Sequence, residues 1–280
     1  YNKIISNIRC SGGSAANTIS GFSMLGNKSG YVGKVKDDEL GQLFVQDITS
    51  LGVNFSTSFS NEGPSTANCL VLVTSDAQRT MVTYLGASVG LTSDDINELD
   101  IVNSEIIYLE GYLWDPPRAK KAFLKAAKLA NEAERRVALS LSDSFCVDRH
   151  RSEFRSLIKN HIDIVFANEE EIISLYNSKN LEDAIVAIRT SCDLAVITRG
   201  ARGSIVVRTS EIIHINAEPV QSVIDTTGAG DAYAAGFLHG LVNHFDFQKS
   251  ARIGSICASE VITHYGARPE TPLLKLIASC

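Results

Sequence analysis

Short apolar runs alternate with longer amphipathic stretches from Glu105 onward, and this alternation limits the possible folds more than any other feature of the sequence. Four of the apolar runs predict strands, at Ile106–Leu109, Val137–Leu141, Ile162–Phe166 and Leu194–Thr198. Strands that alternate with helices are typical of βαβ units. The pattern therefore predicts an α/β protein with a mostly parallel central sheet and helices on both of its faces.

The clearest helix of this region is predicted over Arg118–Glu134. It follows Asp115-Pro116-Pro117, where the aspartate is expected to cap the helix and a proline fits the first turn. One face carries an apolar stripe with helical spacing, formed by Ala122, Ala126, Leu129 and Ala133.

The segment from about residue 55 to residue 88 departs from this alternation. Leu70–Val73 and Met81–Tyr84 flank a polar break at Ser75–Gln78, which predicts a β-hairpin, and we expect that hairpin to form a lid over a site. The sequence contains no internal repeat, low-complexity tract or obvious linker. We therefore expect a single domain over residues 1–280, with a β lid drawn mainly from about 55–88.

Charge and composition exclude several classes of protein. A formal net charge of -6 argues against a protein that binds the nucleic-acid backbone, since such a protein concentrates Lys and Arg on one face. The six cysteines are scattered, which favours a reduced compartment over a disulfide framework or a zinc cluster. No segment approaches the ~18 consecutive apolar residues of a membrane span. We expect a cytoplasmic protein whose partners are neither nucleic acid nor membrane.

The start of the chain is unusual for an α/β protein. Tyr1 is not an initiator Met, and residues 1–10 reach a glycine-rich turn without first supplying a full strand. We expect that an N-terminal piece is missing from this chain.

The sharpest local signal is Asp225-Thr226-Thr227-Gly228-Ala229-Gly230-Asp231, followed by an alanine-rich run. Glycines let the backbone approach a ligand closely, and the alanine-rich run predicts a helix. A glycine turn that opens a helix is an anion site, because free N–H groups and the positive end of the helix dipole converge there. Asp231 is expected to stay ionised and to accept a hydroxyl proton. From the residues alone, a plain helix cap at Asp231 is an equally good interpretation.

The same run, with its Ala-Gly-Phe continuation, resembles the C-terminal signature of the ribokinase/PfkB family of carbohydrate and nucleoside kinases. Gly12-Gly13-Ser14-Ala15-Ala16-Asn17-Thr18 resembles the N-terminal glycine signature of that family. The resemblance extends over essentially the whole chain. It implies a ribokinase-like three-layer α/β/α fold with a small β-sheet lid, and an ATP-dependent kinase with Asp231 as its catalytic base. The catalytic anion site would be completed by Gly228, Ala229 and Gly230.

The resemblance also implies where the two substrates bind. Gly12, Gly13 and Asn17 would contact the hydroxyl groups of the phosphate acceptor, although Asn17 could instead pair with its own backbone in a turn. Thr198, Gly200, Gly203 and Thr226 would contact ATP. The turn at Thr198–Gly203 follows a predicted strand, so it is also interpretable as a plain connection to a strand at Ser204–Val207. Arg199 and Arg202 are available to phosphates, but solvated arginines are commoner.

Metal ions enter through the same resemblance. Asn168 and Glu171 match an Asn-x-x-Glu element, which implies that they position Mg²⁺ through water beside the ATP phosphates. The same pair also matches a helix capping box. A monovalent cation, K⁺, would lie near Asp225 and the carbonyl of Thr227. The residues around this cation would also include Val261, His264 and Gly266. Glu270 stands at a position where some relatives have a small hydroxyl residue.

The acceptor is less constrained than the reaction. Ser14–Thr18, Thr80–Ser88 and Glu110–Asp115 resemble the adenosine kinase-like bacterial branch, in which adenosine is the expected substrate. Tyr112 and Trp114 could stack on a purine or could plug the end of the sheet. Ribose or fructose is the alternative acceptor, and an inactive nucleoside or sugar sensor is a further alternative. The protein is expected to be a monomer or a homodimer formed through the lid.

Overall fold

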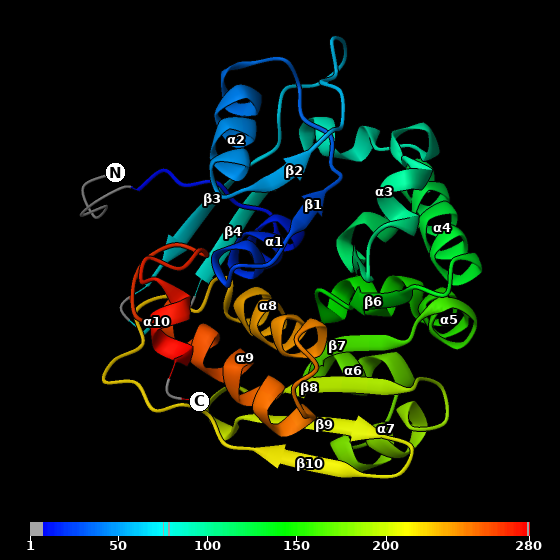
Figure 1. Ribbon diagram of the computed structural model, residues 1–280, viewed down its shortest axis with the longest axis vertical. Coiled ribbons are helices and arrows are strands. Elements are labelled where there is room, and N and C mark those ends of the chain that lie inside the picture. The colour runs from blue at the N-terminus through cyan, green and yellow to red at the C-terminus, as the bar shows by residue number, and fades with distance from the viewer. Residues whose placement is uncertain (1–7, 75, 78, 279) are drawn as a thin grey trace.

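The computed structural model describes residues 8–74, 76–77, 79–278 and 280, and its largest sheet has six strands in the order β10-β9-β8-β7-β6-β5 (Figure 1). Neighbouring strands from β5 to β8 are parallel, while β9 and β10 are antiparallel. The sheet is therefore mixed, with the predicted parallel part on one side. Its strands are β5 Ile106–Glu110, β6 Arg136–Ser140, β7 Ile164–Asn168, β8 Leu194–Thr198, β9 Ser204–Arg208 and β10 Ile212–Ile215.

Helices and short 3₁₀ turns connect these strands and extend the chain at both ends. The α-helices are α1 Ser14–Met24, α2 Glu39–Ser50, α3 Glu98–Val102, α4 Pro117–Glu132, α5 Ser144–His161, α6 Glu169–Tyr176, α7 Leu181–Ile188, α8 Ala229–Val242, α9 Phe247–Val261 and α10 Leu273–Ile277. The 3₁₀ turns are η1 Gly86–Gly90, η2 Ser93–Asp95, η3 Gly111–Trp114 and η4 Gly200–Arg202.

Two hydrophobic layers sandwich the sheet, because successive side chains of a strand point to opposite faces. Val137 and Leu139 of β6 join the cluster that packs against α4 to α7, whereas Ala138 joins the cluster that packs against α8. Figure 1 shows α8 and α9 together in front of part of the sheet. The predicted three-layer α/β/α architecture is confirmed.

Two small sheets lie outside the six-stranded one. β1 Ser29–Tyr31 pairs in parallel with β2 Val53–Phe55, and β3 Asn68–Val73 pairs antiparallel with β4 Arg79–Tyr84. The predicted hairpin is thereby confirmed. Two residues of its predicted turn, Ser75 and Gln78, lie outside the described residues. So does most of the segment at the start of the chain, residues 1–7, on which the prediction of a missing N-terminal piece depends.

The prediction that Asp115 caps α4 is wrong. The helix begins at Pro117 after Pro116, without a side-chain cap. The Asp115 carboxylate is held instead by Arg149 at 2.7 Å and by His150 at 2.6 Å. The helix also ends two residues before the predicted Glu134, because Glu134 takes a left-handed conformation with φ 57° and the chain turns there.

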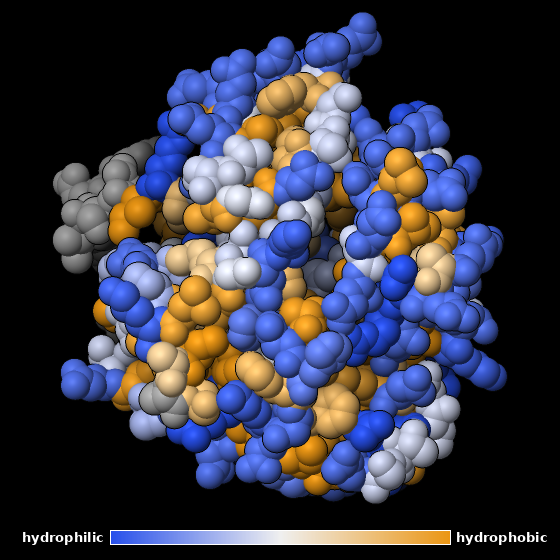
Figure 2. All heavy atoms as spheres, viewed as in Figure 1, coloured by the Kyte–Doolittle hydropathy of each residue, from blue (hydrophilic) through white to orange (hydrophobic). Residues whose placement is uncertain are grey.

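Strand β7 is displaced from its predicted position by two residues. α5 continues to His161, and the Ile162 amide still donates to Ile158 of that helix. At the surface, polar and charged residues cover most of the visible face, with small groups of apolar residues between them (Figure 2). Among the described residues, no helix has the length and apolar character needed to cross a membrane.

Candidate active site

Two helices point their amino ends at one carboxylate. α1 begins at Ser14 and α8 at Ala229, and the two helices pack closely where Gly21 faces Ala235. Asp231 lies in the first turn of α8. Its Oδ1 accepts a hydrogen bond from the Ser14 hydroxyl at 2.7 Å, and its Oδ2 accepts one from Asn17 Nδ2 at 2.9 Å. Residues from the two predicted signatures, far apart in the sequence, therefore meet at Asp231.

Asn17 is almost fully buried, at 6% exposed, and its side chain is committed to this meeting point. The interpretation in which it pairs with its own backbone is wrong, since its amide group donates to Asp231. Its Oδ1 atom is buried and has no hydrogen-bond partner among the described residues. A buried acceptor without a partner is costly, so this oxygen is well placed to receive a hydroxyl donor from a ligand.

The electrostatics of Asp231 differ from the sequence-based expectation. Burial raises the pKa of Asp231 from 3.8 to about 6, although the hydrogen bonds from Asn17 and Ser14 and the charge of Arg79 act in the opposite direction. The expected stabilisation of the ionised form by the helix is thus outweighed by desolvation. The carboxylate is mostly ionised at pH 7 and its pKa suits proton transfer near neutrality.

The turn in front of α8 depends on one of its two glycines. Gly228 has φ 80°, and a Cβ atom there would lie 2.6 Å from the Ala267 carbonyl oxygen. A side chain at Gly230 would meet nothing within 4 Å, so the space around it is open. Asp225 fixes the start of the turn, since its carboxylate accepts from the Thr227 amide, the Thr227 hydroxyl and the Gly266 amide at 2.9, 2.6 and 3.1 Å.

The glycines before α1 have a similar division of roles. Gly13 caps the helix with φ 100°, which a side chain would disfavour, and its carbonyl accepts from the Asn17 amide at 2.8 Å. A Cβ atom at Gly12 would meet nothing within 4 Å. The backbone at Gly12 is therefore open to an approaching ligand.

Glu110 belongs to the site although it stands in neither of the two glycine signatures. It is the last residue of β5, and its Oε1 accepts from the Ala15 amide at 3.1 Å, at the amino end of α1. Burial, helped by the nearby charge of Asp231, raises the pKa of Glu110 to about 7, although the hydrogen bond from the Ala15 amide acts in the opposite direction. An acidic residue at the carboxyl end of a predicted parallel strand was the available signal.

Arg79 is a second residue of the site that stands in neither signature. It lies in β4 of the lid, and its Nη1 donates to the Thr226 hydroxyl at 2.5 Å. Its charge lowers the pKa of Asp231. A positive charge is thus brought from the lid to the glycine turn, a contact that no local pattern around Arg79 indicates.

The predicted nucleotide turn has the local structure of a strand connection. Thr198 ends β8 and pairs with Ser204 of the antiparallel strand β9, while Gly200 and Gly203 have φ 57° and 77°. Arg199 and Arg202 both pair with Glu169 at the start of α6, Arg199 at 3.6 Å. Both arginines therefore have a carboxylate partner, and the Arg202 side chain also remains 62% exposed to solvent.

Asn168 and Glu171 form a complete capping box at the start of α6. Asn168 donates to both Glu171 oxygens, from its amide at 2.9 Å and its side chain at 2.7 Å, and Asn168 Oδ1 accepts from the Glu171 amide. Burial raises the pKa of Glu171 to about 7. In the part of the chain that the structure describes, no group of three His, Cys, Asp or Glu side chains is arranged to hold a metal ion.

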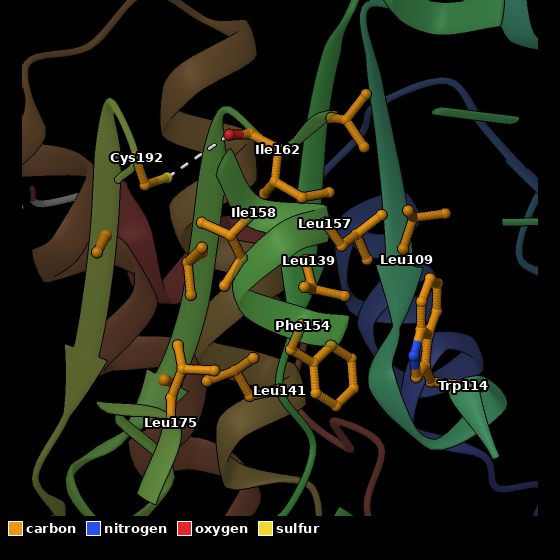
Figure 3. Close-up of a cluster of buried hydrophobic side chains, with 14 of the residues drawn as sticks. Leu109, Trp114, Leu139, Leu141, Phe154, Leu157, Ile158, Ile162, Leu175 and Cys192 are labelled. Carbon is orange, nitrogen blue, oxygen red and sulfur yellow. Dashed lines mark hydrogen bonds between the residues drawn. The ribbon is translucent and has the colours of Figure 1, made fainter. Parts of the chain in front are cut away.

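The two aromatic candidates for stacking have different positions. Trp114 is 5% exposed and lies in the core beside Phe154 (Figure 3). Its ring nitrogen donates a hydrogen bond to Glu153 at 2.6 Å, so it plugs the sheet end. Tyr112 is 40% exposed, and its hydroxyl donates to the Ser142 carbonyl at 3.2 Å. Of the two, only Tyr112 is accessible to a ligand.

Known proteins resemble this chain over nearly its whole length. The model of the pfkB family carbohydrate kinases matches residues 9–273. A 5-dehydro-2-deoxygluconokinase of Halalkalibacterium halodurans is 28% identical over 276 residues, which cover 95% of this chain and 83% of that protein.

Among solved structures, the adenosine kinase of Sinorhizobium meliloti is 43% identical, with a TM-score of 0.95 over 97% of this chain and 84% of that one. A probable sugar kinase of Rhizobium etli is 41% identical, with a TM-score of 0.95 over 97% and 83%. A putative ribokinase II of E. coli in complex with ATP and Mg²⁺ is 18% identical, with a TM-score of 0.89 over 99% and 94%, and shows likeness of fold.

Proposed function

Because the chain belongs to the pfkB family of carbohydrate kinases and has a ribokinase-like fold, we propose that it transfers the γ-phosphate of ATP to a hydroxymethyl group of a neutral, polyhydroxylated acceptor. Adenosine is the first candidate. One observation carries the proposal: the Asp231 carboxylate at the start of α8 accepts hydrogen bonds from Ser14 and Asn17 at the start of α1.

The acceptor hydroxyl would replace or share the Ser14 and Asn17 donors at Asp231. Asp231 would take its proton as the oxygen attacks the γ-phosphorus and the bond from that phosphorus to the β-phosphate oxygen breaks, which releases ADP. Asn17 Oδ1 would accept a hydrogen bond from a second hydroxyl of the acceptor. The amides at Gly228, Ala229 and Gly230, on the positive end of α8, would stabilise the charge on the transferred phosphoryl group. Phosphoryl transfer depends mainly on positioning and on charge stabilisation, and this geometry supports both.

Arg79 supports the same step from the lid. Its contact with Thr226 places a guanidinium group beside the glycine turn when the lid is in the observed position. Thr198, Gly200, Gly203 and Thr226 are the residues we propose for contacts with ATP. Arginine is suited to phosphate oxygens because its planar group donates two parallel hydrogen bonds.

Magnesium fits the site only through water. Both Glu171 oxygens already accept from Asn168, so direct coordination would break the capping box of α6. A Mg²⁺ ion bound to the ATP phosphates retains several waters, and Asn168 and Glu171 would hold such waters. The ion would supply neutralisation of phosphate charge. A monovalent cation would have to share the Asp225 carboxylate with three donors, so the proposed mechanism includes none.

The charges of the site favour a neutral acceptor. Glu110 and Asp231 are two partly buried acids at the start of α1, and an acceptor with its own carboxylate would be repelled by them. Tyr112 offers an exposed ring for stacking on a base. The likeness to the Sinorhizobium meliloti adenosine kinase supports a nucleoside.

A sugar acid is a second candidate because of the Halalkalibacterium halodurans 5-dehydro-2-deoxygluconokinase. ADP release should be measured with adenosine, other nucleosides, ribose, fructose and 5-dehydro-2-deoxygluconate. We expect kcat/KM for adenosine to exceed that for ribose, fructose and the sugar acid by at least about tenfold, since these acceptors have no base and base stacking contributes about 1–3 kcal/mol. Turnover confined to the sugar acid would refute the proposal of a neutral acceptor. If ribose or fructose were the best substrate, adenosine would be refuted as the acceptor and the protein would be a carbohydrate kinase.

The lid also provides the surface we propose for a homodimer. Leu70, Val82 and Tyr84 project from one side of the β3–β4 hairpin and are 59%, 61% and 46% exposed. A two-stranded hairpin with an exposed apolar face is marginally stable by itself. Sedimentation should detect a dimer that Val82→Lys dissociates, whereas a wild-type monomer at micromolar concentration would contradict this assignment.

A further inference from the structure

A buried carboxylate at the end of α9 holds a loop that no substrate is proposed to touch. The side chain of Glu260 is 6% exposed. Its Oε1 accepts from the Glu270 amide at 3.0 Å and from the Thr271 amide at 2.7 Å, and its Oε2 lies 3.3 Å from His264 Nε2. Glu260 thus joins both parts of residues 262–271, which we call the C-terminal loop.

The C-terminal loop forms the outer wall of residues 225–231, the phosphate turn. The Ile262 carbonyl accepts from the Ile224 amide at 2.8 Å, directly before the turn. The Gly266 amide donates to Asp225 Oδ2 at 3.1 Å. Ala267 lies so close beneath Gly228 that a Cβ atom at Gly228 would be 2.6 Å from the Ala267 carbonyl oxygen. The loop therefore contacts the phosphate turn at Asp225 and Gly228, and the residue before the turn at Ile224.

We propose that Glu260 is a positioning residue for phosphoryl transfer, acting through the C-terminal loop on the phosphate turn and Asp231. This inference rests on the proposed function of that turn. Removing the carboxylate takes the acceptor away from the Glu270 and Thr271 amides, and the end of the loop loses its hydrogen bonds to α9. Any movement of Gly266 or Ala267 is passed to Asp225 and Gly228, because these groups are in direct contact. Displacement of a reacting group by about 1 Å costs roughly a hundredfold in rate.

The test compares three substitutions at Glu260 with a matched control. Glu260→Gln keeps a carbonyl oxygen for the two amides, Glu260→Asp draws the acceptor back by one methylene, and Glu260→Ala removes it. The control is Asp163→Ala, because Asp163 also accepts a backbone hydrogen bond, from the Val137 amide at 2.7 Å, but at the opposite, amino ends of β6 and β7. kcat and KM are measured per folded molecule.

We expect kcat to fall about 10- to 100-fold in Glu260→Ala and Glu260→Asp, with both KM values within about threefold of wild type. Glu260→Gln should retain kcat within about threefold, and Asp163→Ala should be less stable but should turn over normally. Equal kcat in Glu260→Ala and wild type, equal losses in the Gln and Ala variants, or an equal loss in Asp163→Ala would each overturn the proposal. If Glu260→Ala does not fold, the comparison of the Asp and Gln variants decides.

Hydrogen exchange separates this inference from the proposed function, since it requires no turnover. Amides of residues 224–230 should exchange faster in Glu260→Asp than in wild type and in Asp163→Ala, under conditions in which global unfolding does not limit their exchange. Unchanged exchange there would overturn the positioning role even in an active kinase. A wild-type protein without turnover on any acceptor would overturn the proposed function, while faster exchange would still support the mechanical link.

Discussion

Glu110→Gln should make the protein more stable, by an amount that depends on pH. The native state raises the Glu110 pKa from 4.5 to about 7, so the folded protein holds a proton that the unfolded chain has released. Stability therefore falls as pH rises from about 4.5 to 7. At pH 8 the cost of the ionised carboxylate is about 3 kcal/mol, and at pH 5 it is about 1 kcal/mol, with each pKa unit equivalent to about 1.4 kcal/mol.

A glutamine relieves this cost without losing the hydrogen bond. Its carbonyl oxygen can still accept from the Ala15 amide, which Glu110 Oε1 accepts at 3.1 Å. For a chain of this size, about 1 kcal/mol raises Tm by roughly 2 °C. Thermal unfolding should thus show a Tm increase of about 6 °C at pH 8 and about 2 °C at pH 5.

Glu105→Gln is the matched control, because Glu105 directly precedes the same strand but is half-exposed and pairs with Arg136 at 3.1 Å. It should change Tm by no more than about 2 °C at either pH. An equal gain for Glu110→Gln at the two pH values, or a loss at pH 8, would refute the reasoning. The gain should come with a rise of about tenfold in KM for the acceptor, since functional sites commonly sacrifice stability.

Three further predictions concern the phosphate turn. Arg79→Ala should lower kcat about 10- to 100-fold with little change in Tm, and an unchanged kcat measured by ADP release would remove the lid arginine from the mechanism. kcat/KM for the acceptor should fall about tenfold per pH unit below pH 6, because the base must be ionised and the Asp231 pKa is raised to about 6; a profile flat to pH 5 would contradict this. Gly228→Ala should abolish turnover through its clash with Ala267, whereas Gly230→Ala, with open space around it, should fold normally.

The sequence supported the architecture because the signals there are local. Apolar runs of strand length and the Ala122 and Ala126 stripe fix elements that the structure contains, and the strand from Leu194 to Thr198 was placed to the residue. A prediction was wrong where a side chain that fits a local motif is bound instead by residues distant in the sequence. Asp115 was expected at a helix cap, but a guanidinium and an imidazole from α5 bind it instead.

The sequence predicted only those residues of the candidate site that belong to a recognisable motif. Asn17 and Asp231 stand in two recognisable signatures, and the structure brings them within hydrogen-bonding distance. Glu110 and Arg79 stand in no such pattern, because their positions follow from the order of the strands and from the contact of the lid with Thr226. The rise of the Asp231 pKa could not be predicted from the sequence either, because it results from burial, which depends on the assembled fold rather than on the turn.

Asp231→Asn tests the central claim most directly, because it keeps the shape of the side chain and removes the base. ATP binding, measured by calorimetry, should stay within about threefold of wild type, while kcat with the best acceptor should fall at least about a hundredfold. Near-normal turnover of the asparagine variant, with the nucleotide bound as in wild type, would contradict the account.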